Sequence, residues 1–224
     1  MRGPGKYHSA VLWDMDGTLI DSEPLHFQSM VHALASFGIA ADGGLQARTT
    51  GLSESEVLAF CRSELGVTVS HERWADLRNT YYLARAGSLA ARPGALPVFL
   101  QLKRRGIPQA VVSNSARTIV DANLRALSLH DGAVPSISRN DVRMAKPHPE
   151  PYLLALQRSG YQASDCIVIE NAPLGVISAR AAQITTIAVN TGLLEASDLA
   201  DAGANTVLPG TQALYEAWSA ISTK

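Results

Sequence analysis

Cysteine is scarce in this sequence, and its scarcity excludes several classes of protein. Cys61 and Cys166 are the only cysteines among the 224 residues. They lie far apart and outside any CxxC spacing, which argues against a disulfide framework or a zinc site and fits a reducing compartment. We therefore expect two buried thiols in a cytoplasmic protein.

The sequence also lacks an excess of one charge and a long apolar run. Its 19 basic and 20 acidic residues give a formal charge of −1, so we expect neither a basic stripe for nucleic acid nor a polybasic patch for a membrane. No apolar stretch approaches the roughly 20 residues that span a bilayer, and the first ten residues lack the apolar region of a signal peptide. We expect a soluble protein whose partner is a small molecule.

The first part of the chain has a helical pattern. Hydrophobic residues make up 46% of the sequence, enough for one core or for one core and a smaller lobe. Between residues 21 and 92 all the signals are helical, beginning with Asp21 or Ser22 as an N-cap, and Ser53 with Glu56 makes a capping box. This segment is expected to form a small bundle of helices.

From residue 93 the pattern changes to short β-branched runs that alternate with amphipathic segments. The expected strands cover residues 107–114, 133–138, 165–171, 185–190 and 205–208. Strands that alternate with helices build a parallel sheet with helices on both faces, and the run at residues 9–14 belongs to this sheet in composition. The sequence thus predicts an α/β fold: a doubly wound, Rossmann-like core of residues 1–20 and 93–224, with a helical cap domain of residues 21–92 inserted after the first strand.

Polar side chains follow three of the expected strands, at the point where each strand ends. The three pairs are Asp14 and Asp16, Ser113 and Asn114, and Glu170 and Asn171. Ligands of open α/β sheets bind outside the carboxyl ends of the strands, so these residues are expected in one crevice. Lys146 lies in an extended, proline-rich segment before a helix that begins near Pro151, and it would reach the same crevice.

These residue types fit phosphoryl transfer through a covalent intermediate. One carboxylate attacks phosphorus, and a second, two residues further on, protonates the leaving oxygen and later activates water. Mg²⁺ prefers oxygen ligands and usually takes only one or two protein carboxylates, so Asp14 with Glu170 or Asn171 would suffice. Ser113 would donate a hydrogen bond to a phosphoryl oxygen, and Lys146 would offset the negative charge.

The stretches DMDGTLIDSE, VVSNS, KPHPEPY and IENAPLG occur in this order. Together they resemble the four motifs of the haloacid dehalogenase superfamily, in the branch of β-phosphoglucomutase and phosphoglycolate phosphatase. The resemblance covers nearly the whole chain, including the position of the inserted cap. It implies that Asp14 is the nucleophile and Asp16 the general acid/base, whose presence favours phosphatases and phosphomutases over dehalogenases.

The same resemblance implies roles for further residues. Lys146 joins the two aspartates in the catalytic set, and Mg²⁺ would be held by Asp14, Asp16, Glu170 and Asn171. The expected phosphate- and substrate-binding residues are Gly17, Thr18, Ser113 and Asn114 from the core and His26, Arg48, Thr50, Gly51 and Arg78 from the cap. The fourth motif commonly contains two adjacent acids, and Asn171 replaces one of them here, so we expect metal dependence with weaker affinity.

Several of these residues also have ordinary structural interpretations. Ser113 or Ser115 would serve equally well as a helix N-cap. His26 either faces the crevice or is solvated, and Arg48 either binds an anionic group or lies on the surface.

The sequence therefore predicts a monomeric, Mg²⁺-dependent phosphatase of a small phosphorylated metabolite, with sugar phosphates as the first candidates. Three alternatives stay open. One is a phosphomutase of the β-phosphoglucomutase type, which returns the phosphoryl group to a sugar. The second is an inorganic pyrophosphatase, because KPHPEPYLLAL, VIENAPLGV and IAVNTGLL resemble a bacterial branch of the superfamily that contains one. The third is a non-catalytic sensor of phosphorylated metabolites.

Overall fold

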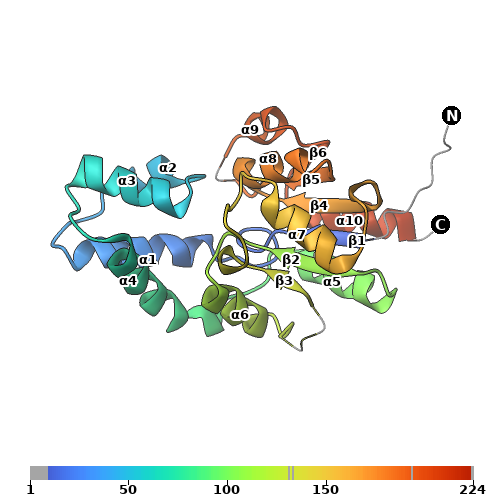
Figure 1. The fold of residues 1–224 in the computed structure, drawn as a ribbon, viewed down its shortest axis with the longest axis horizontal. Helices are drawn as coiled ribbons and strands as arrows, with labels where there is room; N and C mark the ends of the chain where they lie inside the picture. The colour runs from blue at the N-terminus through green and yellow to red at the C-terminus, as the bar shows by residue number, and fades with distance from the viewer. Residues whose placement is uncertain (1–9, 131, 133, 193, 223–224) are drawn as a thin grey trace.

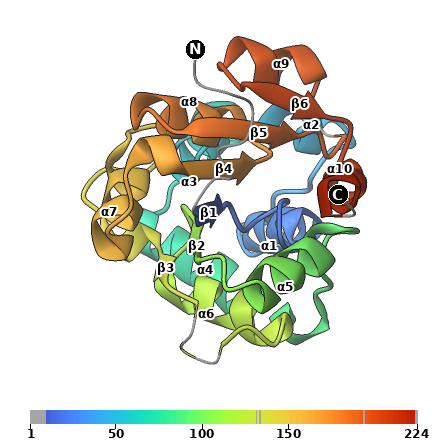
Figure 2. The same ribbon diagram turned by 90° about the vertical axis from the view of Figure 1, so that its right-hand side faces the viewer.

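The structure is a computed structural model that describes residues 10–130, 132, 134–192 and 194–222. Residues 1–9, 131, 133, 193, 223 and 224, which the sequence assigns to the core domain, lie outside the described residues. Six parallel strands form one sheet in the order β3-β2-β1-β4-β5-β6 (Figure 2). The strands are β1 (Ala10–Trp13), β2 (Gln109–Val112), β3 (Ser136–Ile137), β4 (Cys166–Glu170), β5 (Thr185–Val189) and β6 (Thr206–Leu208). Because the strand order reverses beside β1, the sheet is doubly wound, and the predicted fold class is confirmed.

Helices cover both faces of the sheet (Figure 2). They are α5 (Ala95–Arg104), α6 (Arg117–Ala126), α7 (Glu150–Ser159), α8 (Pro173–Ala181), α9 (Ala196–Asp201) and α10 (Thr211–Ser222), with short 3₁₀ helices η2 (Arg139–Asp141) and η3 (Ala163–Asp165). Successive residues of β1 point to opposite faces: Val11 and Trp13 pack with α5 and α6, whereas Leu12 packs with α7. The first strand is therefore buried on both faces, as is usual for a parallel sheet.

Between β1 and α5 the chain forms a separate group of helices at one end of the molecule (Figure 1). They are α1 (Glu23–Ala35), α2 (Leu45–Thr49), α3 (Glu54–Leu65), α4 (His71–Leu83) and the short η1 (Ala86–Ser88). These helices enclose a hydrophobic cluster of their own around Leu34, Leu58 and Trp74. The capping box of Ser53 and Glu56 begins α3 as predicted, whereas sequence analysis does not predict α2. We propose that residues 21–92 are a cap domain.

Two chain segments connect this helical group to the sheet, and they run side by side. Ile20 and Ala91 form an antiparallel bridge, and the Asp21 N–H donates to the Ala90 carbonyl oxygen at 2.9 Å. Arg92 closes the pair of segments by donating from Nη1 to Asp21 Oδ1 at 2.9 Å. The helical group is thereby held over the carboxyl ends of the strands. Among the described helices, none is both long and apolar enough to cross a membrane.

Candidate active site

A buried lysine joins the ends of three strands. Asp14 directly follows β1, and its main-chain N–H donates to Ile169 of β4 at 2.9 Å. The ammonium of Lys146 donates to Asp14 Oδ1 at 2.8 Å, to Glu170 Oε1 at 2.6 Å and to the Val112 carbonyl oxygen of β2 at 2.8 Å. Lys146 is only 4% exposed. The three motifs predicted to converge therefore meet at one ammonium group.

Neighbouring side chains hold this ion-pair cluster in place. Asn114 binds the main chain of Lys146 twice, donating to its carbonyl oxygen at 3.0 Å and accepting from its N–H at 2.9 Å. The hydroxyl of Tyr152, from α7, donates to Glu170 Oε1 at 2.8 Å. The amide of Asn114, predicted to bind phosphate, thus makes its hydrogen bonds to the main chain that carries the lysine, although the residue also lines the cavity described below.

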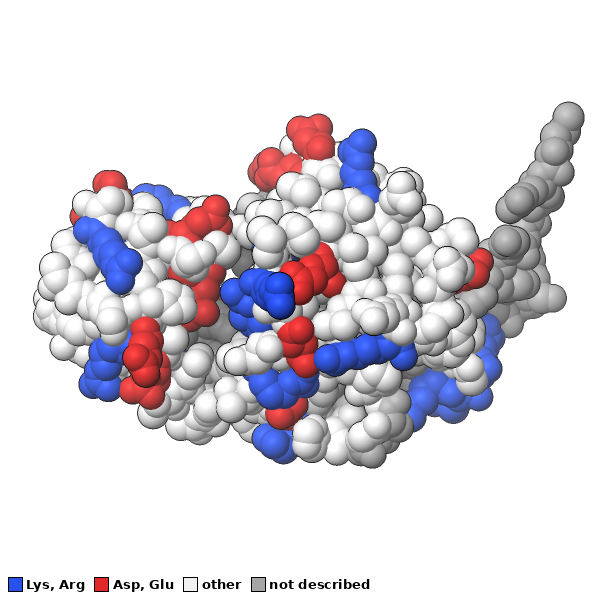
Figure 3. Space-filling model, in the orientation of Figure 1, with Lys and Arg blue, Asp and Glu red and all other residues white. Residues whose placement is uncertain are grey.

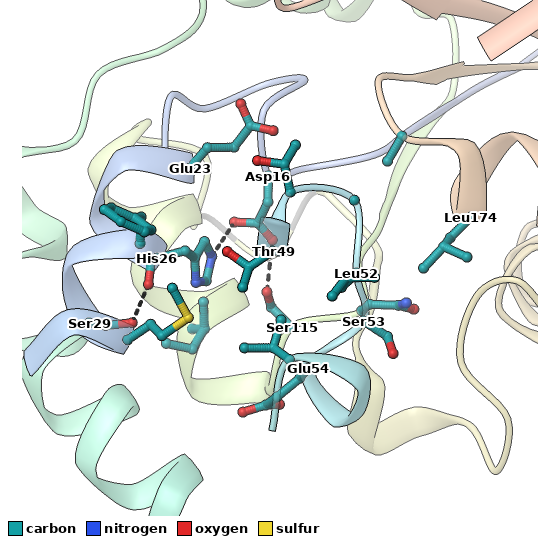
Figure 4. Close-up of a pocket in the computed structure, with 18 of the residues that line it drawn as sticks. Asp16, Glu23, His26, Ser29, Thr49, Leu52, Ser53, Glu54, Ser115 and Leu174 are labelled. Carbon is teal, nitrogen blue, oxygen red and sulfur yellow. Dashed lines mark hydrogen bonds and ion pairs between the residues drawn. The ribbon is translucent and has the colours of Figure 1, made fainter. Parts of the chain in front are cut away.

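The carboxylate of Asp16 accepts five side-chain hydrogen bonds, and Figure 4 shows those from His26 and Ser115. The donors are Ser22 at 2.7 Å, His26 at 3.1 Å and Asn123 at 3.0 Å, which contact Oδ1, and Ser113 at 3.0 Å and Ser115 at 2.8 Å, which contact Oδ2. Burial alone would raise the pKa of Asp16, but these bonds, led by that from His26, hold it well below its usual range. In this structure both side-chain oxygens of Asp16, which was predicted to bind the metal, accept hydrogen bonds from protein groups.

Carboxyl groups outnumber ammonium groups in the buried cluster. Burial and the neighbouring Glu170 raise the pKa of Asp14 to about 8, although Lys146 opposes the shift. Burial works against the charged form of Lys146, but Asp14 and Glu170 outweigh it and raise the lysine pKa. The Lys146 ammonium thus pairs with the carboxyl groups of both Asp14 and Glu170, and the carboxylate of Asp16 lies nearby.

This excess of buried carboxylate oxygen fits a hard divalent cation such as Mg²⁺. Within the described residues, no group of three or more His, Cys, Asp or Glu side chains is arranged to hold a metal. The protein ligands would be the carboxylates of Asp14 and Glu170 and the amide oxygen of Asn171. Because Mg²⁺ usually keeps several waters and binds substrate phosphate, this small set is sufficient.

Asn171 is positioned by residues from the loop after β1 and from α1. Its Oδ1 accepts from the Thr18 hydroxyl at 3.3 Å, and its Nδ2 donates to Glu23 Oε1 at 3.1 Å. Gly17 has a φ of 82°, and a Cβ added there would overlap the Asn171 amide. Gly17 and Thr18, predicted to bind phosphate, are therefore packed around the amide that replaces the second acid of the fourth motif.

A cavity of about 310 Å³ opens above the cluster and is lined by both the sheet and the helical group. His26, Thr50, Gly51 and Arg78, which were predicted to bind substrate, are among the residues that line it. Arg48 does not belong to this lining: it pairs with Asp42 and lies over the ring of Phe60 on the surface.

Arg78 brings a buried positive charge to the cap side of the cavity. Its side chain is 13% exposed, and its nearest acid is Glu54, with Arg78 Nη1 and Glu54 Oε1 3.8 Å apart. Its Nε donates weakly to the Ser29 hydroxyl at 3.4 Å. The face of the molecule in Figure 3 carries acidic and basic side chains together on both sides of the hollow between the helical group and the sheet.

Several residues of this site carry no role predicted from the sequence. Ser22 was predicted only as an N-cap, but it begins α1 without a side-chain cap because its hydroxyl donates to Asp16. Asn123 lies on the buried face of α6, and a polar residue among apolar ones on a buried face is a signal that could have identified it. Glu23 and Tyr152 are the last residues of the first and third motifs, DMDGTLIDSE and KPHPEPY, but no role was predicted for them, and Tyr82 lies in no motif.

A doubly wound sheet with two aspartates after its first strand, a buried lysine and a helical insertion defines a class of α/β hydrolases. Residues 11–189 match the haloacid dehalogenase-like hydrolase family, and the chain belongs to this family. The predicted resemblance is confirmed.

Relatives and solved structures agree with this assignment. The chain is 30% identical to hexitol phosphatase A of Escherichia coli over 80% of its own length and 82% of that protein. It is 35% identical to the chloroplastic protein SUPPRESSOR OF QUENCHING 1 of Arabidopsis thaliana over 87% of its own length, but spans only 19% of that much longer protein. A solved structure from Bacteroides vulgatus, provisionally named a beta-phosphoglucomutase, superimposes with a TM-score of 0.80 at 31% identity, covering 98% of this chain and 91% of that one. The chain is an enzyme, a phosphatase of this family.

Proposed function

We propose that this enzyme is a Mg²⁺-dependent phosphatase that hydrolyses a small sugar or polyol phosphate through an aspartyl phosphate on Asp14. The observation that carries the proposal is the Lys146 ammonium, which lies within 2.8 Å of both Asp14 and Glu170 at the floor of the cavity. A buried lysine beside a carboxylate neutralises charge where an anionic phosphoryl group must approach an anionic nucleophile.

In the first step, a carboxylate oxygen of Asp14 forms a bond to phosphorus, and the bond from phosphorus to the substrate oxygen breaks. Asp16, which holds the proton that it took from water in the second step of the preceding turnover, donates that proton to the departing oxygen. The product leaves as an alcohol and Asp16 becomes a carboxylate. The hydroxyls of Ser113 and Ser115 lie beside Asp16 and donate to the phosphoryl oxygens. Lys146 stabilises the charge on the phosphoryl group as it is transferred.

In the second step, Asp16 takes a proton from a water molecule, and that water attacks the phosphorus of the aspartyl phosphate. The bond between phosphorus and Asp14 breaks, which regenerates the carboxylate and releases inorganic phosphate. Mg²⁺ held by Asp14, Glu170 and Asn171 would supply further charge stabilisation to the phosphoryl oxygens and keep them in place.

The cap side of the cavity supports an uncharged substrate body. Its only charged side chains from residues 45–80 are Glu54 and Arg78, which offset each other, and the other polar groups are hydroxyls and amides such as those of Thr50 and Asn79. Such groups suit the hydroxyls of a sugar or polyol. The volume of about 310 Å³ is small for a ligand cavity and favours a small metabolite.

Phosphate release from a panel of hexose phosphates, hexitol phosphates, phosphoglycolate, nucleotides and pyrophosphate tests the proposal, with Mg²⁺ and with chelator. We expect one sugar or polyol phosphate to give the highest kcat/KM, Mg²⁺ to be required, and Asp14→Asn to be inactive. Asp42→Asn, which alters a surface acid outside the cavity lining, serves as the matched control and should keep full activity. Turnover that survives in Asp14→Asn contradicts the mechanism.

A phosphomutase is the second candidate, favoured by the similarity to the Bacteroides vulgatus structure. In a mutase the phospho-enzyme returns its phosphoryl group to a sugar instead of to water. Isomerisation of a hexose 1-phosphate in the presence of the corresponding bisphosphate, with little phosphate release, would decide for this candidate.

A further inference from the structure

The two oxygens of the Asp16 carboxylate are held differently. Oδ1 accepts three hydrogen bonds, from the start of α1 and from α6, whereas Oδ2 accepts only from the hydroxyls of Ser113 and Ser115. These two hydroxyls are the ones proposed to bind the phosphoryl group. A phosphoryl group that takes them leaves Oδ2 free, while Oδ1 remains anchored.

Asn123 is the donor to Oδ1 that comes from the core, and it is fully buried. Its Nδ2 donates to Asp16 Oδ1 at 3.0 Å and lies 3.4 Å from the sulfur of Met15, while its Oδ1 accepts from the Tyr82 hydroxyl at 2.8 Å. Turning the amide over would place its oxygen against the carboxylate and the sulfur, two acceptors. The orientation of the amide is therefore fixed by its partners.

Tyr82 belongs to α4 of the helical group, so this chain of hydrogen bonds runs between the cap helices and the core. Its side chain is 1% exposed, and its ring lies 4.5 Å from the ring of His26, another donor to Asp16. The same tyrosine packs against Leu25 and Ile119, at the junction of α1, α4 and α6. The hydrogen bonds from Tyr82 to Asn123 and from Asn123 to Asp16 thus depend on the position of α4 relative to α6.

We propose that Asn123, oriented by Tyr82, is a positioning residue that anchors Oδ1 of Asp16 so that Oδ2 is the oxygen that transfers the proton. In the first step the Oδ2–H bond breaks as the leaving oxygen gains the proton. In the second step Oδ2 takes a proton from the attacking water. This inference rests on the proposed function, because it assigns a partner to the acid/base of that reaction.

The test compares two substrates that differ in their need for a proton. The departing oxygen of a sugar or polyol phosphate must be protonated, whereas p-nitrophenolate leaves as an anion. The value of kcat/KM reports only the steps up to formation of the phospho-enzyme, so the water-activation step does not obscure the comparison. The alkyl substrate is the sugar or polyol phosphate that the panel selects, and the reference substrate is p-nitrophenyl phosphate.

Asn123→Ala should lower kcat/KM for the alkyl phosphate by about tenfold or more and for p-nitrophenyl phosphate by less than about threefold. Tyr82→Phe removes only the hydroxyl and should shift the ratio of the two values in the same direction by a smaller factor. The double variant should shift this ratio no further than Asn123→Ala alone, because both residues act through one hydrogen-bonded chain.

Leu124→Ala is the matched control, because Leu124 is buried on the same helix but belongs to the hydrophobic core. It should lower stability and leave the ratio of the two kcat/KM values unchanged. If Asn123→Ala does not fold, the ratio of the two kcat/KM values in Tyr82→Phe tests the inference by itself. Equal losses on both substrates, or no loss on either, would overturn the inference while leaving the phosphatase intact. Activity that survives Asp14→Asn would instead overturn the proposed function.

Discussion

Gly175 lies directly against the carboxylate of Glu170, so closely that a Cβ added to this glycine would overlap the carboxylate oxygens. Glu170 ends β4, and Gly175 lies in the first turns of α8. The carboxylate also accepts the main-chain N–H groups of Asn171 at 3.1 Å and Ala172 at 3.3 Å. The start of α8 therefore forms the pocket that aims Glu170 at Lys146.

We predict that Gly175→Ala displaces Glu170 and lowers kcat by about a hundredfold or more, because the loss of a charged partner in a buried cluster leaves Lys146 and Asp14 misplaced. Alanine ordinarily stabilises a helix relative to glycine, so a fall in Tm would itself indicate the overlap. Gly87→Ala is the control, since a Cβ there meets nothing within 4 Å. Full activity of Gly175→Ala would show that Glu170 can move without consequence.

The convergence of three of the four motifs could be predicted from the sequence because the carboxyl ends of parallel strands meet at one edge. That rule brought Asp14, Ser113 and Glu170 together without any knowledge of side-chain direction. The same rule does not say which partners a side chain finds there, and Ser113 contacts Asp16 directly in the structure.

The residues that surround Asp16 could not be predicted in the same way. Ser22 at the start of α1 and Asn123 of α6 donate to it, and Tyr82 of α4 donates to Asn123. The packing angles between helices are not encoded in local sequence patterns. Arg48 is a residue that was predicted to belong to the site but does not line it. Its forked donor suggested an anion site, but it pairs with Asp42.

Asn171→Asp should strengthen metal binding. The substitution restores a second carboxylate beside Glu170, and it places that carboxylate where the Asn171 amide now donates to Glu23 at 3.1 Å. Repulsion between the two acids should lower the Tm in chelator, and a bound cation should relieve it. We expect the Mg²⁺ concentration for half-maximal activity to fall by about tenfold, equivalent to about 1.4 kcal/mol.

Thermal unfolding with and without Mg²⁺ checks this expectation independently of turnover. The Mg²⁺-induced rise in Tm should be larger for Asn171→Asp than for the natural sequence, and smaller for Asn171→Ala, which supplies no oxygen. An unchanged Mg²⁺ dependence in all three proteins would place the metal away from residue 171.

Asp141 should contribute stability that depends on pH. It accepts from the Ser138 N–H at 2.8 Å and hydroxyl at 2.6 Å and pairs with Arg117 and Arg158. Burial acts to raise its pKa, but the bonds from Ser138 and Arg117 outweigh burial and lower it well below its usual range. Because folding favours the ionised form, the stabilisation is complete above about pH 5 and is lost as the pH falls through the lowered pKa.

Asp141→Asn should therefore reduce the free energy of unfolding by about 1–2 kcal/mol at pH 7, and the difference should shrink steadily between pH 5 and pH 2. Denaturant unfolding at a series of pH values measures it. Asp76→Asn is the control, because Asp76 and its partner Arg73 are both about 60% exposed and such pairs contribute little. A difference that does not vary with pH would mean that the lost packing, and not the charge, causes the change.

Glu54 should select against substrates that carry a second negative charge. It lines the cavity beside Arg78, with Arg78 Nη1 and Glu54 Oε1 3.8 Å apart, and without it the cap side would present an unopposed buried guanidinium. Glu54→Gln is therefore expected to raise kcat/KM for a sugar bisphosphate or phosphoglycolate by about three- to tenfold relative to a neutral sugar or polyol phosphate.

The control for this prediction is Glu64→Gln, which removes the same charge from the exposed far end of the same helix, about 15 Å away at 1.5 Å per residue. Both variants change the net charge of the protein equally, so a general electrostatic attraction of anions would raise the two ratios together and would contradict a local role for Glu54. If only Glu54→Gln raises the ratio of kcat/KM values, and adding Arg78→Met abolishes the rise, the selection against a second negative charge is due to this pair. Raising the salt concentration should weaken the effect, because screening acts mainly on exposed charges and the Glu54 side chain is 44% exposed.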